Sequence, residues 1–352
     1  MPGGIANPRI TRTLPLTTPW DHAGGVKPLV AALACALVAA AGLAAHASSV
    51  AQQPNGTIVL SCSGCPQDTS GPVLIGIAVR TGAATTLVGP CDDAVTPTCA
   101  APSQPAFSRD GSKLALIDRF TAVAVAARNG KGYRVLPATR AITAGVPRSF
   151  SGVSWSPGGN RLVTSALDGM KLPDGSNRTS IFTVDPRTGA MRRIRASTPA
   201  TGNFVDPAWS PEGDLIATGS SAERLYLMRS DGTKLRRLGS SVVSGRNPAW
   251  SPDGRRVAAL DMGGSVWWIA RAGGRKHLVV HDPDLDWNAG LAWSPDGRWL
   301  VYARTTLSED TFDSVGHELM LAAVDGSGAR RLEVPALPAD AYSEIYGFAW
   351  SR

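Results

Sequence analysis

The chain has 352 residues, of which 43% are hydrophobic and 18% charged, which is enough apolar material for one large domain. Its 38 glycines and 26 prolines are typical of a fold with many turns. The formal net charge of +7 is spread along the chain and no nucleic-acid-binding motif accompanies it, so the composition argues against a nucleic-acid partner.

Residues 1–47 have the features of a secretory signal peptide. Three basic residues precede an apolar run at residues 28–45, and the small residues Ala45 and Ala47 then form an Ala-x-Ala cleavage site. We therefore expect an exported protein that is secreted, periplasmic or associated with the cell envelope. An uncleaved membrane anchor at residues 28–45 is the alternative, because 18 apolar residues approach the length that spans a bilayer.

After a short linker at residues 48–56, three segments rich in apolar and β-branched residues predict β-strands. They are Thr57–Cys62, Leu74–Val79 and Thr85–Gly89. No copy of the repeat described below precedes them. The folded domain is expected to occupy residues 57–352.

Four cysteines follow the predicted leader, namely Cys62, Cys65, Cys91 and Cys99. An even number of cysteines in an exported chain favours disulfides. Local pairs, Cys62 with Cys65 and Cys91 with Cys99, are preferred over crossed pairs. A zinc site that begins with the CxxC pair is the alternative.

A short motif of the type "PAWSPDG" recurs six times from residue 103 onward, at spacings of 41 to 57 residues. Its copies are centred on Phe107, Trp155, Trp209, Trp250, Trp293 and Trp350. Pro, Asp and Gly of "SPDG" are the residues that a tight turn between two strands requires. Repeats of this length with strand-like content are typical of propeller blades, whereas helical periodicity is absent.

Each repeat predicts four antiparallel strands, A to D, with the motif aromatic near the end of strand A and packed between neighbouring blades. In one unit, strand B is Arg255–Asp261 and strand C is Ser265–Ala270. The last motif, Gly347–Ser351, is a strand A with no strand after it, and the first three strands lack a strand A. Pairing of the two ends gives an all-β, six-bladed propeller that is closed by its C-terminal strand.

The repeat resembles that of the TolB-like, or WD40-like "WSPDG", propeller family over Thr57–Arg352. The resemblance implies the fold but says little about activity. Arg109 replaces Pro in the first copy, and Gly158 and Glu212 replace Asp in the second and third. The α/β domain that precedes the propeller of TolB is expected to be missing here, so the envelope partners of TolB are not carried over.

The B–C and D–A connections of an up-and-down blade emerge on one face, and here they are long and irregular. Binding residues on a repeat scaffold usually lie in such loops. We expect a monomeric, non-enzymatic scaffold that binds a protein or a cell-envelope component through this face, around the channel mouth. The candidate residues are Asn203, Asp206, Arg246, Asn247, Asp286, Trp287, Asn288, Glu344 and Tyr346.

The alternative is a metal-assisted propeller enzyme, a lyase or a lactonase-like hydrolase that acts on a small polar substrate at the channel mouth. Alternating carboxylates at Asp282, Asp284 and Asp286 are a weak calcium candidate. The sequence contains no nucleophile elbow, phosphate-binding loop or dinucleotide fingerprint, so no catalytic residue is assigned and no cofactor is expected. His277 and His281 are four residues apart on a predicted strand, which is about 13 Å and too far for one metal ion.

Overall fold

The computed structural model describes residues 54–63, 72–89, 102–140, 149–239, 246–307, 314–335 and 344–352. They belong to one compact unit that runs from Gln53 to Arg352. The predicted signal segment at residues 1–47 lies outside the described residues. Within the described ranges, no helix has the length and apolar character needed to cross a membrane.

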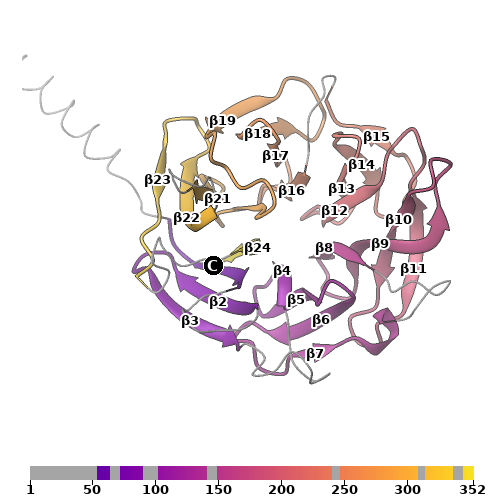
Figure 1. Cartoon of the computed structure of the whole chain (residues 1–352), viewed down its shortest axis with the longest axis horizontal. Helices are drawn as coiled ribbons and strands as arrows, with labels where there is room; N and C mark the ends of the chain where they lie inside the picture. Colours follow the sequence, from indigo (N-terminus) through magenta and orange to yellow (C-terminus); the bar gives the residue numbers. More distant parts are fainter. Residues whose placement is uncertain are drawn as a thin grey trace, which may run out of the picture. The chain divides into compact units, whose positions relative to one another are not determined.

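Six four-stranded antiparallel sheets surround a central channel, as predicted (Figure 1). From the channel outwards, blade 1 contains β24 (Ile345–Ser351), β1 (Thr57–Cys62), β2 (Val73–Ala78) and β3 (Ala83–Val88). Blade 2 contains β4 (Pro102–Phe107), β5 (Lys113–Asp118), β6 (Ala122–Ala127) and β7 (Arg134–Val135), followed by the 3-10 helix η1 (Pro137–Thr139). Blade 3 contains β8 (Phe150–Trp155), β9 (Leu162–Lys171), β10 (Asn177–Val184) and β11 (Met191–Ala196).

The remaining three blades have the same order. Blade 4 contains β12 (Phe204–Trp209), β13 (Leu215–Ser220), β14 (Tyr226–Arg229) and β15 (Arg236–Arg237). Blade 5 contains β16 (Arg246–Trp250), β17 (Arg256–Asp261), β18 (Ser265–Ala270) and β19 (His277–His281). Blade 6 contains β20 (Leu291–Trp293), β21 (Trp299–Leu307), β22 (Ser314–Ala323) and β23 (Ala329–Arg331).

The two ends of the folded unit close the ring. Strand β24 pairs antiparallel with β1, with Thr57 opposite Ser351 and Leu60 opposite Phe348. The indole of Trp350 also donates a hydrogen bond of 2.9 Å to the carbonyl oxygen of Asn55. The prediction that the C-terminal strand completes the N-terminal blade is confirmed.

The repeated serine that follows each aromatic holds the A–B turn together. Ser251 Oγ accepts a hydrogen bond from the backbone N–H of Arg256 and donates one to Asp253, while Gly254 takes a φ of 67°. Such a φ suits glycine, which has no Cβ to clash. Because these contacts lie within five residues of one another, the turn is encoded locally.

Two copies lack the turn aspartate and use a later residue in its place. Ser156, which precedes the "PGG" turn, donates to Asn160 Oδ1, and Ser210 donates to Asp214 Oδ1. The departures at Gly158 and Glu212 therefore leave the serine side chain bonded.

Most motif tryptophans pack between neighbouring blades, as predicted. Trp250 lies in a core cluster with Ala217 and Val257, and its indole donates to Ala208 O of blade 4 at 3.1 Å. Trp293 donates in the same way to Ala249 O of blade 5 at 3.0 Å. Each of these indoles ties its own blade to the one before it.

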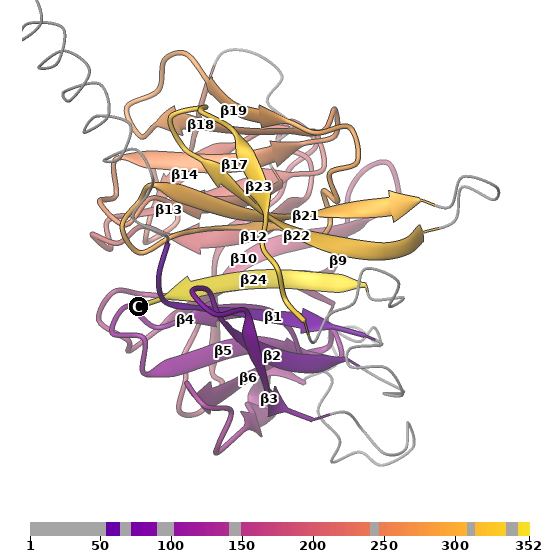
Figure 2. The same ribbon diagram turned by 90° about the vertical axis from the view of Figure 1, so that its left-hand side faces the viewer.

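The sequence interpretation was wrong about two of the long connections. Residues 167–179 and 305–316 were expected to be irregular loops, but strand pairing continues far into both, in β9–β10 and in β21–β22. These two hairpins extend beyond the other strands on the long-loop face (Figure 2). In each hairpin, the backbone N–H and C=O groups of the two strands form hydrogen bonds with each other. In an irregular loop at this position, these groups would form hydrogen bonds with water.

Candidate functional site

A ring of six backbone positions with positive φ lines the central channel. In or directly before each innermost strand, the residue three positions before the motif aromatic has a positive φ, and all six of these residues line one cavity. They are Gln104 (51°), Gly152 (64°), Asp206 (50°), Asn247 (51°), Gly290 (82°) and Gly347 (118°). In five of the six blades the pairing of the innermost strand shifts register here, which is the mark of a β-bulge.

The three glycines of this ring make room for its three polar residues. A Cβ on Gly152 would lie 2.7 Å from the Cα of Asp206, and a Cβ on Gly347 would lie 3.0 Å from the Cα of Gln104. A Cβ on Gly290 would lie 3.4 Å from the Cγ of Asn247. The ring therefore holds one carboxylate and two carboxamides, each beside a glycine of an adjacent blade.

Asp206 is the acidic group of the ring. Ser151 Oγ of blade 3 donates to Asp206 Oδ1 at 2.9 Å, and the backbone N–H of Asn247 and the charge of Arg246 also favour the carboxylate. Burial outweighs these contacts, because it removes the charged form from water, and the pKa of Asp206 is raised. A carboxylate with a raised pKa in a concave site is a candidate functional group.

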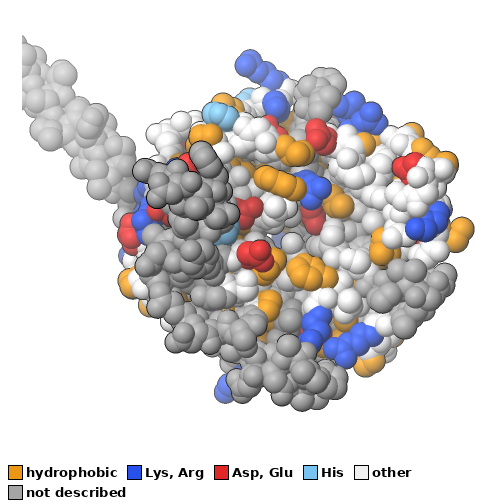
Figure 3. All heavy atoms as spheres, in the orientation of Figure 1, with side chains coloured by type: hydrophobic (Ala, Val, Ile, Leu, Met, Phe, Trp, Pro, Cys, Tyr) orange, Lys and Arg blue, Asp and Glu red, His pale blue; other side chains and the backbone are white. Residues whose placement is uncertain are grey.

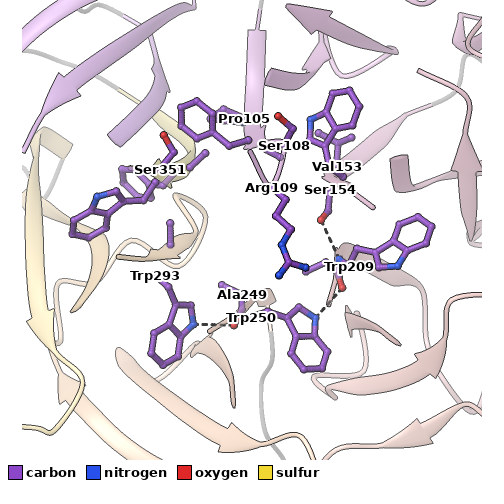
Figure 4. A pocket seen from close by; sticks show the side chains of 18 of the residues that line it. Pro105, Ser108, Arg109, Val153, Ser154, Trp209, Ala249, Trp250, Trp293 and Ser351 are labelled. Carbon is purple, nitrogen blue, oxygen red and sulfur yellow. Dashed lines mark hydrogen bonds between the residues drawn. The ribbon is translucent and has the colours of Figure 1, made fainter. Parts of the chain in front are cut away.

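A cavity of about 770 Å³ reaches from this ring to the face of the A–B turns. Its outer rim includes Pro157, Pro211, Pro252 and Pro295 from four turns, and Arg109 at the same position of the first turn. The Arg109 side chain points from blade 2 into the middle of the cavity, towards Trp209 and Trp250, and donates a hydrogen bond to Pro211 O (Figure 4).

The other mouth of the channel, on the long-loop face, is bordered by aromatic and charged side chains. Phe120 is 45% exposed, and its ring meets that of Tyr346 edge to face at 5.8 Å. The guanidinium of Arg246 lies 4.7 Å from the ring centre of Trp287, whose carbonyl accepts a hydrogen bond from the Asn247 side chain at 3.2 Å. Around the centre of this face, hydrophobic side chains lie beside basic and acidic ones (Figure 3).

The candidate residues from the sequence divide into three groups. Asp206 and Asn247 line the channel, whereas Arg246, Trp287, Glu344 and Tyr346 belong to the contacts at its long-loop mouth; the Tyr346 hydroxyl donates to Glu344. Asn203, Asp286 and Asn288 have structural contacts instead. The Asn203 side chain bonds the backbone of Thr179 and Asn177, and Asp286 accepts from the backbone of Asn288.

Sequence reasoning missed Arg109, Gln104 and Phe120. Arg109 had a signal, since it departs from the proline of the repeat. Phe120 also had one, because it is a large apolar residue in a short turn. Gln104 had none, because its position matters only through the bulge.

The calcium candidate aspartates all contact protein side chains. Tyr302 donates its hydroxyl to Asp282 at 3.0 Å, Arg304 pairs with Asp284 at 2.6 Å, and His317 Nε2 lies 3.1 Å from Asp286. Across the described ranges, no three His, Cys, Asp or Glu side chains are grouped as metal ligands.

The two histidines of β19 do not meet either. The His277 ring stacks on Trp268 at 4.0 Å, and His281 Nδ1 lies 3.3 Å from Ser265 Oγ. Each is occupied by a contact within its own blade.

The cysteine predictions fall mostly outside the described residues. Cys62 is buried at the end of β1, whereas Cys65, Cys91 and Cys99 are not described. Their pairing stays a prediction.

Comparison with known proteins connects this architecture to TolB. No protein-family model matches the sequence. A TolB homologue of Chlorobium luteolum is 32% identical over 109 residues, which are 29% of this chain and 22% of that protein. The crystal structure of TolB from Acinetobacter baumannii matches 84% of this chain and 66% of that one, with a TM-score of 0.61 and 18% identity. The described domain is a six-bladed β-propeller with the fold of the TolB propeller.

The same fold also occurs in an enzyme. An oligogalacturonate lyase from Vibrio parahaemolyticus matches the TolB-like propeller over 81% of this chain and 82% of its own, with a TM-score of 0.51 and 12% identity. The sequence match covers only about a fifth of the curated TolB relative. The shared architecture therefore establishes only the fold of this domain. Its activity depends on the residues of the site.

Proposed function

We propose that the TolB-like propeller is exported and binds a protein of the cell envelope through its long-loop face. The observation that carries this proposal is the pair of aromatic contacts at the channel mouth, Phe120 with Tyr346 and Arg246 with Trp287. Aromatic residues and arginine are the side chains that contribute most often to protein–protein binding energy. The apolar run at residues 28–45 of the predicted signal segment and the likeness to TolB support export.

The conformation of Phe120 adds a second argument. Both Arg119 and Phe120 have a positive φ, 49° and 57°, in the turn between β5 and β6. A bulky residue rarely adopts this conformation, and retaining it costs on the order of 1–3 kcal/mol. Within the described part of the chain, Phe120 gains little burial in return, since 45% of it stays exposed. A ligand that covers the ring would supply the missing contact.

Affinity capture from an envelope extract tests the proposal when four proteins are compared quantitatively. The wild type and Leu278→Ala are expected to capture the same protein, whereas Phe120→Ala and Trp287→Ala lose it. Leu278 is a matched control because it is also an exposed apolar residue, 61% exposed, but lies on the outermost strand of blade 5.

The captured protein is then purified and its affinity measured with each variant. We expect Phe120→Ala and Trp287→Ala to weaken binding by about tenfold or more, as for hot-spot residues. Equal binding by all four proteins would show that the partner does not use this face.

A further inference from the structure

The turn-side half of the channel carries an excess of cationic groups that the proposed function does not use. Arg109 and Arg352 occupy the same position of the repeat, directly after the serine, in the neighbouring blades 2 and 1. Arg128 lies beside them on the cavity wall. The other four copies have proline at this position, so the rim has a cationic arc over two blades and an apolar arc over four.

The lining carboxylates offset part of this charge but do not pair directly with Arg109. Asp110 accepts hydrogen bonds from Ser108 and Ser112 in its own turn, which lower its pKa to about 2. Asp206 lies at the bulge ring, five residues before Pro211, which belongs to the rim. In the part of the chain that the structure describes, no carboxylate lies within ion-pair distance of Arg109.

Contacts with the protein hold Arg109 and Arg128 in place. Arg109 reaches across the cavity and donates to the Pro211 carbonyl of blade 4 through one of its five N–H groups. Arg128 donates to Thr57 Oγ1 at 3.0 Å and lies 5.4 Å from the ring centre of Phe107. A guanidinium fixed in this way keeps further donors for a planar oxyanion.

We propose that the turn-side cavity binds a small polar molecule through a carboxylate or phosphate group held by Arg109, with Arg128 as the second cation. The volume of about 770 Å³ lies within the range of pockets that enclose small ligands. The carboxamides of Gln104 and Asn247 at the inner end would bond the polar body of the ligand. The bulge ring separates this site from the aromatic residues of the long-loop mouth.

Isothermal titration calorimetry at low salt tests this site with two probes, inorganic phosphate and succinate. Both share the oxyanion chemistry, and their relative affinities show whether a phosphate or a carboxylate is preferred. We expect Arg109→Gln and Arg109→Pro to weaken binding of the preferred probe by about tenfold or more, because a charge-assisted bond is lost. Added salt should weaken binding by the wild type.

Two features of the variants keep the test decisive. Arg109→Pro restores the residue present in four other copies, so its fold is expected to survive. Arg187→Gln is the matched control, since the Arg187 side chain is 87% exposed and does not line the cavity, and probe binding by this variant should equal that of the wild type.

Failure of both probes to bind, or wild-type affinity in Arg109→Pro, would overturn the proposal. Equal losses in Arg187→Gln would overturn it as well. Phe120→Ala is expected to leave probe binding unchanged, which separates this proposal from that for the long-loop face.

Discussion

Gly152 of blade 3 and Asp206 of blade 4 meet in the bulge ring so closely that a Cβ on the glycine would lie 2.7 Å from the Cα of the aspartate. Both residues have a positive φ, 64° and 50°. Each blade therefore shapes the backbone of its neighbour at the point where the channel is lined by Asp206. The ring is a property of the assembled blades and belongs to no single one.

The crowding at Gly152 predicts a large effect for Gly152→Ala. The substitution adds a methyl group against the backbone of Asp206, so we expect it to lower the free energy of unfolding by about 2–4 kcal/mol, from overpacking and backbone strain together. Gly159→Ala is the control, because Gly159 has nearly the same φ, 66°, and no atom within 4 Å of an added Cβ. Urea unfolding of both variants measures the difference, and equal losses would show that only backbone strain matters.

The raised pKa of Asp206 predicts a stability effect that depends on pH. The pKa of Asp206 in the folded protein lies above its unfolded value, so the folded protein binds the proton more tightly. Burial of the charge therefore lowers the free energy of unfolding as the pH rises from the unfolded pKa to the folded pKa. Asp206→Asn should therefore be more stable than the wild type at pH 7, and this gain should disappear below about pH 4, where the unfolded aspartate is also protonated.

Asn is a suitable replacement because Asn247 already occupies the equivalent position in blade 5 with a φ of 51°. Its amide oxygen can still accept the bond from Ser151. Denaturant unfolding across this pH range measures the change. A variant that is less stable than the wild type at pH 7 would mean that Ser151 and Arg246 stabilise the carboxylate more than burial costs it.

The motif tryptophans offer a measure of the hydrogen bonds between blades. Trp250→Phe removes the bond to Ala208 O, whereas the indole N–H of Trp155 is buried without a partner in the described residues. Trp250→Phe and Trp155→Phe both replace a buried indole by a smaller ring, so the difference between their effects reports the bond. We expect Trp250→Phe to be more destabilising by about 1–2 kcal/mol. Thermal or urea unfolding checks this, and the opposite order would contradict it.

Chelation separates the binding scaffold from a metal-assisted enzyme. Asp282, Asp284 and Asp286 are each engaged by a tyrosine, an arginine or a histidine, so we expect EDTA to leave the unfolding temperature unchanged. Added calcium should likewise have no effect. A rise in the unfolding temperature that saturates with calcium would show a ligand that binds the folded state, and would favour the enzyme.

The sequence contained the information for the blade count and for the closure of the ring. The serine–aspartate–glycine turn at Ser251–Gly254 depends on contacts within five residues, so its chemistry is visible in each copy. The unpaired strand A at the end of the chain and the three strands at its start leave one natural pairing, which β24 and β1 make.

The sequence by itself determined the repeat, its turns and its order around the ring, because those features arise from neighbours along the chain. Only the tertiary structure decided that Arg109 points into a cavity on the turn face, that Phe120 borders the opposite mouth and that Asp206 has a raised pKa. These properties depend on how closely different sheets approach one another. The residues that set that approach, such as Gly152 and Asp206, are 54 positions apart in the sequence and become neighbours only when the blades pack.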